Sequence, residues 1–191
     1  RESSGHNVSV KGGRFLEAVA AANTIVFDKT GTLTYATPTV AQVVPFGGRE
    51  ESEMLRLAAC LEEHYPHSIA NAVVEEAKRR GLSHEEYHSQ VQYVVAHGIS
   101  SMVEGKKAII GSAHFVFEDE GCRIPEGEEE KFSTLPAEYS HLYLCIAGEL
   151  AAVICVHDPL RREAKAAVRA LHDCGIDKVV MMTGDSRRTA E

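Results

Sequence analysis

Two short apolar runs, one near each end of the chain, stop abruptly at acidic and small polar residues. The run at 24–27 is followed by Asp28, and the run at 179–182 is followed by Thr183-Gly184-Asp185. Runs that are apolar on both faces are typical of buried parallel strands. Groups at the carboxyl ends of such strands face the ligand crevice of an open α/β sheet. The pattern therefore predicts two parallel strands with candidate site residues at their ends.

A helical spacing of apolar residues lies between these two runs. Ala164, Val168 and Leu171 share one face, Gly175 follows as a stop signal, and Asp158-Pro159 precedes them as a start signal. A helix before the second strand completes the pattern of an α/β layer, which is split in sequence by the residues in between.

The middle of the chain has a different pattern. Apolar spacing predicts helices over 54–61 and 69–77, the second ending at Gly81. Strand-like runs follow at 91–96, 107–110, 142–147 and 150–156, with Glu104-Gly105 and Gly148-Glu149 as candidate hairpin turns. Residues 117–138, which are rich in Glu, Gly and Pro, are expected to form a surface loop.

These patterns predict an α/β protein, in which an antiparallel α+β domain is inserted into a parallel-sheet domain. Composition and turn signals place the boundaries at 1–37 for the first part of the parallel-sheet domain, 38–154 for the insert, and 155–191 for the second part. We expect the chain to be an excised piece of a longer protein.

Charge and composition exclude several classes of function. The 191 residues include 20 Lys and Arg against 28 Asp and Glu, a net charge of −8, and no basic stripe is interleaved with aromatic residues. This balance argues against a nucleic-acid partner or an anionic membrane surface. The longest apolar run is far too short to span a bilayer.

The candidate chemistry is concentrated in the heptad Asp28-Lys29-Thr30-Gly31-Thr32-Leu33-Thr34. A carboxylate at a strand end can attack a γ-phosphorus in line and form an aspartyl phosphate, so Asp28 is the candidate nucleophile. The turn after it can aim backbone N–H groups and the Thr32 hydroxyl at phosphoryl oxygens. The Asp28 carboxylate and the Thr30 carbonyl are candidate oxygen ligands for Mg²⁺.

The heptad resembles the phosphorylation motif of P-type ATPases. Haloacid-dehalogenase-like phosphatases usually carry a second Asp two positions after the nucleophile, whereas Thr30 occupies that position here. A threonine has no useful pKa for general acid–base work, so we expect the acyl phosphate to persist. The alternative interpretation is a Gly/Thr turn beside a solvated Asp.

Three other segments resemble motifs of this family, and the first of them resembles a motif of its heavy-metal branch, the CPx-type ATPases. They are Lys11-Gly12-Gly13, Asp158-Pro159-Leu160-Arg161 and Thr183-Gly184-Asp185. The resemblance implies that Thr183, together with Lys29, steadies phosphoryl charge and that Asp185 lies near the nucleotide. It implies site roles for Asp158, Arg161 and Gly184. Asp158 has an equally simple structural interpretation as a helix N-cap before Pro159.

The resemblance also implies an adenine site on the insert. The family motif S-E-H-P-L-A aligns His67-Ser68 with its His-Pro, which makes His67 the candidate adenine contact and Ser68 a candidate N-cap. A one-residue shift through Pro66 nominates His64 instead, and Glu63 is a candidate substitute for the family's Glu. A pair of histidines on a solvated helix end is the alternative.

Ala96-His97-Gly98 resembles the family's second adenine motif, G-x-G, with Ala96 in place of the first glycine. Glycine permits close approach of the backbone to a flat base, so Gly98 is a candidate contact. The resemblance places His97 at the mouth of the pocket.

The segment 84–88 formally matches the zinc-peptidase signature H-E-x-x-H. That chemistry requires both histidines on one long helix and a third ligand, and only about eight residues separate Gly81 from the next predicted strand. We therefore interpret the segment as a polar surface connection.

Taken together, the resemblance covers nearly the whole chain. It implies the ATP-binding and phosphorylation portion of a heavy-metal cation-transporting P-type ATPase, with a haloacid-dehalogenase-like fold, at the cytoplasmic face of a membrane. Its cofactors are ATP and Mg²⁺, and its partners are a transmembrane transport domain, which binds the metal cation, and an actuator domain. The family's distal Lys and G-D-G-x-N-D loop do not follow within the 191 residues, so the fragment alone is expected to bind nucleotide but phosphorylate itself poorly. A haloacid-dehalogenase-like phosphatase and a noncatalytic nucleotide-sensing module are the alternatives.

Overall fold

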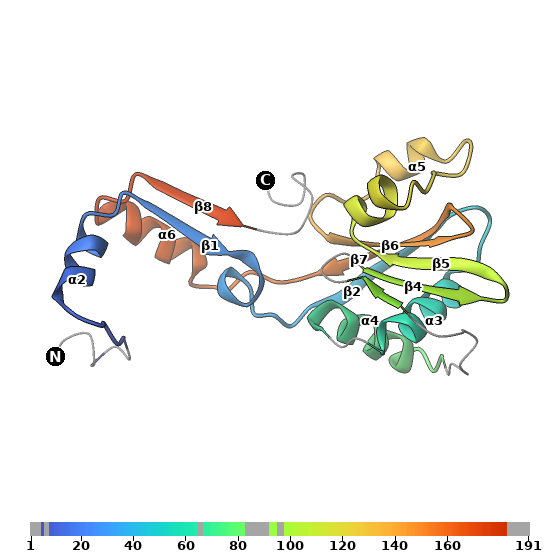
Figure 1. The fold of residues 1–191 in the computed structure, drawn as a ribbon, viewed down its shortest axis with the longest axis horizontal. Helices are drawn as coiled ribbons and strands as arrows, with labels where there is room; N and C mark the ends of the chain where they lie inside the picture. Colours follow the sequence, from blue (N-terminus) through green and yellow to red (C-terminus); the bar gives the residue numbers. More distant parts are fainter. Residues whose placement is uncertain (1–4, 6–7, 65–66, 83–91, 95–97, 183–191) are drawn as a thin grey trace.

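The computed structural model describes residues 5, 8–64, 67–82, 92–94 and 98–182, and its ribbon divides into two parts joined by two chain crossings (Figure 1). We call one the parallel part. It consists of α2 (Gly13–Ala20), β1 (Thr24–Asp28), the single turn η1 (Lys29–Leu33), α6 (Ala164–Asp173) and β8 (Lys178–Met182). We call the other the insert. It contains all elements from β2 to β7.

The strands β1 and β8 pair in parallel, from Thr24 opposite Lys178 to Asp28 opposite Met182. This confirms the predicted parallel pair at the two ends of the chain. The expectation that both faces are buried is wrong for the described residues, because Val26 and Val180 are 53% and 43% exposed. The helix α6 lies beside this pair on one side (Figure 1), and a strand buries both faces only where both are covered.

The helix before β8 begins later than the sequence signals indicate. The first residue of α6 is Ala164 and its N-cap is Glu163, so the interpretation of Asp158 as an N-cap is wrong. Residues 159–161 instead pair with the segment after β1. Leu160 forms a β-bridge with Thr34, and the Arg161 amide donates to the Leu33 carbonyl at 2.8 Å.

The insert is built on one six-stranded sheet of order β2-β7-β6-β5-β4-β3. Every neighbouring pair in it is antiparallel, as predicted. The strands are β2 (Thr39–Pro45), β3 (Gln92–Val94), β4 (Gly98–Val103), β5 (Lys106–Gly111), β6 (Ser140–Ile146) and β7 (Glu149–His157). The apolar runs did not reveal β2 and β4, because polar residues interrupt both.

Two hairpins of this sheet, whose turns lie within the described residues, turn through two residues with positive φ. Glu104 (φ 49°) and Gly105 (φ 75°) connect β4 to β5, as predicted. Ala147 (φ 54°) and Gly148 (φ 82°) connect β6 to β7. The second turn therefore lies one residue earlier than the predicted Gly148-Glu149, and Glu149 already belongs to β7. Two consecutive positive φ values match the right-handed twist of the flanking strands.

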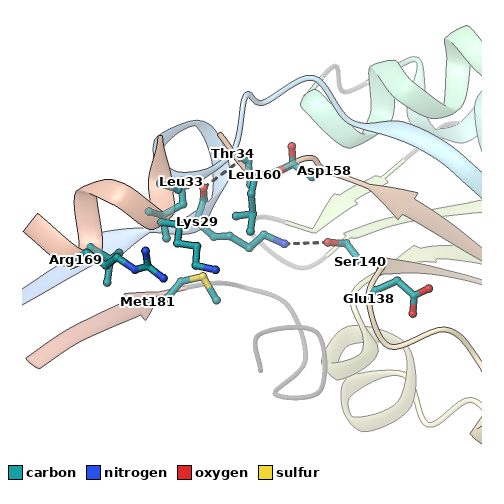
Figure 2. Close-up of a pocket in the computed structure, with 12 residues that line it drawn as sticks. Lys29, Leu33, Thr34, Glu138, Ser140, Asp158, Leu160, Arg169 and Met181 are labelled. Atoms are coloured by element: carbon teal, nitrogen blue, oxygen red, sulfur yellow. Dashed lines mark hydrogen bonds between the residues drawn. The ribbon is translucent and has the colours of Figure 1, made fainter. Parts of the chain in front are cut away.

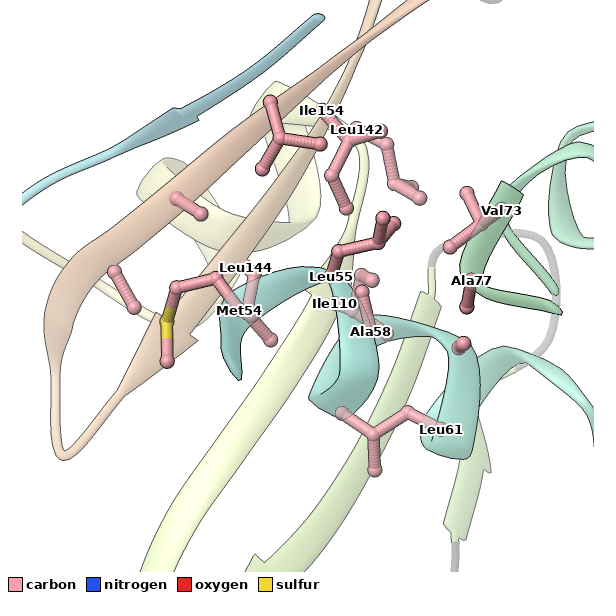
Figure 3. Packing of buried hydrophobic residues seen from close by; sticks show 14 of the residues in the cluster. Met54, Leu55, Ala58, Leu61, Val73, Ala77, Ile110, Leu142, Leu144 and Ile154 are labelled. Atoms are coloured by element: carbon pink, nitrogen blue, oxygen red, sulfur yellow. The ribbon is translucent and has the colours of Figure 1, made fainter. Parts of the chain in front are cut away.

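One face of the sheet is covered by two helices, α3 (Glu51–Glu62) and α4 (Ser68–Arg79), where the apolar spacing predicts them. Leu55, Ala58 and Leu61 of α3 are fully buried, as is Val73 of α4. They pack against residues of β5, β6 and β7 such as Leu144 (Figure 3). Burial of this apolar stripe holds the helices on the sheet.

The other face is covered in part by the segment predicted to be a surface loop, so that prediction is incomplete. The helix α5 (Glu129–Ser133) lies in this segment, and the turn η2 (His114–Asp119) overlaps its beginning. Phe117 packs edge-on against Phe132 and Tyr143, with ring centroids 5.6 and 5.3 Å apart. Because β7 is covered on both faces, its run 150–156 is apolar throughout although the sheet is antiparallel.

The proposed boundary between residues 154 and 155 falls inside β7, whose last residues, Cys155 to His157, still pair with β2. The division of the chain into domains stays a prediction. Within the described ranges, no helix has the length and apolar character that crossing a bilayer demands.

Candidate functional site

Asp28 ends β1, and the chain then turns back on itself. Gly31 has φ +78°, a conformation that glycine adopts without strain. Its amide donates to the Thr34 hydroxyl at 3.1 Å, and the Thr34 amide donates to the Lys29 carbonyl at 3.1 Å. Thr34 is 1% exposed. The turn is therefore closed by its own hydrogen bonds and leaves Asp28 exposed at the strand end.

Arg161 lies in the second chain crossing, between β7 and α6, and binds this turn. Its Nε donates to the Thr34 carbonyl at 3.0 Å, and Nη2 donates to the Gly31 carbonyl at 3.3 Å. Its guanidinium also lies 5.2 Å from the centre of the Tyr35 ring. A planar fork with several donors suits this task better than an ammonium does. Arg161 thus shapes the turn after Asp28 through backbone carbonyls.

Asp158 lies a few residues before Arg161 and is half-buried. One of its carboxylate oxygens, Oδ1, is buried without a hydrogen-bond partner among the described groups. Buried carboxylate oxygens are normally paired, so an unpaired one marks a place that strain or function explains. The side chain lines a cavity at the junction of the two parts.

This cavity has a volume of about 670 Å³ and is lined by residues of both parts (Figure 2). Lys29 reaches across it, and its ammonium donates to the Ser140 hydroxyl at 3.0 Å. Ser140 is the first residue of β6. Asp28 is not among the residues that line the cavity. The structure therefore engages Lys29 with the insert, although Lys29 directly follows the candidate nucleophile.

On the insert, His67 is the N-cap of α4. Its Nδ1 accepts from the Ala70 amide at 3.3 Å, and its Nε2 lies 3.1 Å from Glu62 Oε2. Ser68, a candidate N-cap in the sequence, is instead the first residue of the helix. The hydrogen bond with Glu62 raises the pKa of His67, and partial burial of the ring opposes this. The ring is half-exposed and can meet a ligand on its free side.

A model of the haloacid dehalogenase-like hydrolase family matches residues 22–191. The chain belongs to this family. Among curated proteins, the zinc-transporting ATPase of Synechocystis sp. is 34% identical over 186 residues, which is 97% of this chain and 24% of that protein. The copper-transporting ATPase 1 of Rhizobium meliloti is 37% identical over 179 residues, or 94% of this chain and 21% of that protein. The chain thus spans about a quarter of the length of these relatives.

Solved structures agree with this assignment. The catalytic domain of the CPx-ATPase CopB-B has a TM-score of 0.66 and 25% identity, covering 95% of this chain and 60% of that chain. A zinc-transporting PIB-type ATPase in its E2.Pi state has a TM-score of 0.57 and 31% identity, covering 95% of this chain and 29% of that chain. The resemblance to heavy-metal P-type ATPases and the fold class predicted from the sequence are confirmed.

The sequence analysis of this haloacid dehalogenase-like chain did not predict that the carboxylate of Glu62 is buried. Glu62 is 2% exposed and contacts His67, whereas Glu63, the predicted substitute, lies 4.0 Å from His64. The signal was present, because Leu55, Ala58 and Glu62 share the buried face of α3 at helical spacing. A carboxylate on an apolar helix face requires a partner, and His67 is within reach.

Gly98 has a structural role in this fold. A Cβ built at Gly98 would lie 2.4 Å from the Ile110 carbonyl oxygen and 2.5 Å from the Phe115 ring, so packing at the start of β4 demands glycine. The other candidate residues of this motif, Ala96 and His97, lie outside the described residues. So do Thr183, Gly184 and Asp185, and His84 and His88 of the zinc-peptidase pattern.

The donors near Asp28 suit magnesium. Asp28 and Thr30 are exposed, and the backbone at Thr30 is extended (φ −74°, ψ 121°). A carboxylate and a carbonyl are hard oxygen donors, and Mg²⁺ usually completes its shell with water and substrate phosphate. Within the described residues no cluster of three or more His, Cys, Asp or Glu side chains offers a complete metal site. The set fits an ion shared with a phosphorylated substrate.

Proposed function

We propose that this chain is the ATP-binding and phosphorylation portion of a heavy-metal cation-transporting P-type ATPase, with Asp28 as the phosphate acceptor. The observation that carries the proposal is the heptad 28–34, which the fold places as a closed turn at the carboxyl end of a parallel strand. Similarity to metal-transporting ATPases over nearly the whole chain supports it.

The proposed reaction is an in-line displacement. An oxygen of the ionised Asp28 carboxylate attacks the γ-phosphorus of ATP and forms a new P–O bond. The bond to the β,γ-bridging oxygen breaks, and ADP leaves with that electron pair. Thr30 does not offer a second carboxylate for hydrolysis, which distinguishes this site from that of a phosphatase.

Groups around the turn stabilise the transferred phosphoryl group in this proposal. Backbone amides of η1 other than that of Gly31 face it together with the Thr32 hydroxyl, and Lys29 and Thr183 supply compensating charge and hydrogen bonds. Asp28 and the Thr30 carbonyl hold Mg²⁺, which neutralises phosphate charge when bound. Arg161 keeps the turn in shape, and we assign Asp158, Gly184 and Asp185 to the same site.

ATP is held mainly by the insert, with adenine against the free side of His67. The contact between His67 and buried Glu62 supports this register of the motif over the one that nominates His64. Ser68, Glu63, Ala96, His97 and Gly98 belong to the neighbourhood of this pocket in our proposal. The boundaries 1–37, 38–154 and 155–191 describe the corresponding domains.

The whole protein is proposed to be a membrane transporter, with this portion at the cytoplasmic face. A transmembrane domain carries the metal cation, and an actuator domain completes the cycle. Closure of the insert toward Asp28 delivers the γ-phosphate.

The test is phosphorylation of the intact transporter with ATP labelled in the γ-phosphate. We expect an acid-stable, hydroxylamine-labile label in the wild type and none in Asp28→Asn, because an amide cannot form the acyl phosphate. Thr30→Asp is expected to shorten the lifetime of the label by supplying a general base. An unchanged label in Asp28→Asn contradicts the proposal.

A further inference from the structure

The two chain crossings between the parallel part and the insert are bound to each other. The Tyr35 amide donates to the Pro159 carbonyl at 3.2 Å, and Thr34 and Leu160 form a β-bridge. These two short paired segments form a narrow ribbon that joins the parts. The orientation of the insert therefore depends on contacts outside this ribbon.

The hydrogen bond from Lys29 to Ser140 is such a contact. Its two residues are 9% and 7% exposed and lie 111 positions apart in the chain. Lys29 follows the candidate nucleophile directly, and Ser140 begins a central strand of the insert's sheet. The bond thus links the insert to the turn that carries Asp28 (Figure 2).

Broad packing between helices and strands does not fix the orientation of the insert in the described structure. No helix or strand of the parallel part packs broadly against an element of the insert within the described ranges. The space between them is the cavity of about 670 Å³, with Glu138 on one side and Lys165 and Arg169 of α6 on the other. Because the bond joins two buried groups across the junction, its loss or exchange changes the balance between orientations of the insert.

We propose that Ser140 is a positioning residue for the phosphorylation reaction, which holds the Lys29 ammonium on the insert and releases it to the γ-phosphate when the insert closes. The proposal rests on the function proposed above. A phosphate is a stronger acceptor for an ammonium than a neutral hydroxyl, so the exchange is favourable once the phosphate arrives. Before the phosphate arrives, the free energy needed to break the bond between Lys29 and Ser140 opposes closure of the insert.

The test compares Ser140→Ala with the wild type in the intact transporter, using the initial rate of acyl-phosphate formation as a function of ATP concentration. Removal of the hydroxyl is expected to lower the half-saturating ATP concentration roughly three- to tenfold, the effect of one hydrogen bond, and to leave the rate at saturating ATP unchanged. Ser140→Thr keeps the hydroxyl and is expected to restore the wild-type value. Ser133→Ala, at an exposed serine of α5, is the control.

The outcomes separate this inference from the proposed function. If the wild type forms the label on Asp28 but Ser140→Ala shows the wild-type or a higher half-saturating concentration, the role of Ser140 is wrong and the proposed function stands. If Ser140→Ala lowers the melting temperature but does not change the half-saturating ATP concentration, Ser140 has only a structural role and the inference is likewise wrong. If the wild type forms no label on Asp28, both are wrong.

Discussion

At the scale of single residues, the pairing of Glu62 with His67 shows how burial selects one carboxylate over its neighbour. Glu62 and Glu63 are chemically alike and adjacent, yet Glu62 lies on the buried face of α3 and Glu63 does not. The buried carboxylate needs a polar or charged partner, and the Nε2 of His67 lies 3.1 Å from its Oε2. The contact orients the ring and leaves its other side exposed.

Replacing His67 with alanine is expected to weaken both folding and nucleotide binding. The variant leaves the Glu62 carboxylate buried without this partner, which lowers the free energy of unfolding by about 1–3 kcal/mol. Urea denaturation and titration with ATP measure the two effects. His64→Ala is the control, with a change within about 0.5 kcal/mol because His64 is a surface residue. Loss of ATP binding in His64→Ala alone would instead support the alternative register of the motif.

The same pair predicts a pH dependence. Because the pKa of His67 is raised in the folded protein, its pairing with Glu62 contributes stability that is fully present below its ordinary pKa of 6.5. This contribution is lost as the pH rises through the raised pKa. Denaturation series from pH 5 to pH 9 are expected to show it in the wild type and not in Glu62→Gln. Equal pH profiles for the two proteins would contradict the assignment.

At the scale of elements, a cluster of charged residues joins the beginning of α3 to the end of α4. The Glu76 carboxylate accepts from Arg79 Nε and Nη2 and from Arg80 Nε, each at 2.7 Å. Arg80 Nη1 also donates to Glu51 at 2.6 Å. The apolar faces of both helices rest on the same sheet face, and this cluster fixes how the helices lie against each other.

Hydrogen bonds from Arg79, and then from Arg80, lower the pKa of Glu76 to about 2. The cluster therefore contributes stability above the ordinary carboxyl pKa of 4.5 and loses it as the pH falls toward 2. Glu76→Gln is expected to lower the free energy of unfolding by about 1–3 kcal/mol at pH 7. It is also expected to weaken the decrease of stability with falling pH below 4.5. Glu75→Gln, at the exposed neighbouring position, is the matched control, and thermal melts followed by circular dichroism measure both. If the stability of the two variants falls equally with decreasing pH, the cluster does not contribute to the acid dependence of stability.

At the scale of the whole molecule, the second chain crossing shapes the turn that follows the first strand. Arg161 binds carbonyls of Gly31 and Thr34, about 130 residues away in sequence. The bridge between Thr34 and Leu160 adds to this contact. The conformation beside Asp28 is thus set jointly by both crossings.

Arg161→Met is expected to reduce the rate of phosphorylation from ATP roughly tenfold, because the turn loses two hydrogen bonds near the attacking carboxylate. Nucleotide affinity, which we assign to the insert, is expected to change little. Arg162→Met is the control, because Arg162 is exposed and contacts Tyr35 through its backbone amide. Stopped-quench labelling of the intact transporter measures the rate, and equal losses in both variants would argue against a specific role for Arg161.

The sequence alone determined the elements whose signals are local. Apolar periodicity located α3, α4 and the parallel strands, and the heptad after β1 identified the candidate nucleophile. Glycine-containing turn signals located two hairpins within one residue. Local signals failed where burial depends on distant partners. The segment 117–138 is polar in composition, yet its few aromatic residues cover a sheet face.

Only the tertiary structure decided which side chains meet across the fold. The bonds from Lys29 to Ser140 and from Arg161 to Thr34 join residues more than 100 positions apart, and no periodicity encodes such pairs. The partner of Glu62 likewise became visible only when the start of α4 was placed beside the end of α3. The physical reason is that backbone propensity and patterning act over a few residues, whereas polar side chains in a folded interior bind whatever partner the packing of the whole chain brings within reach.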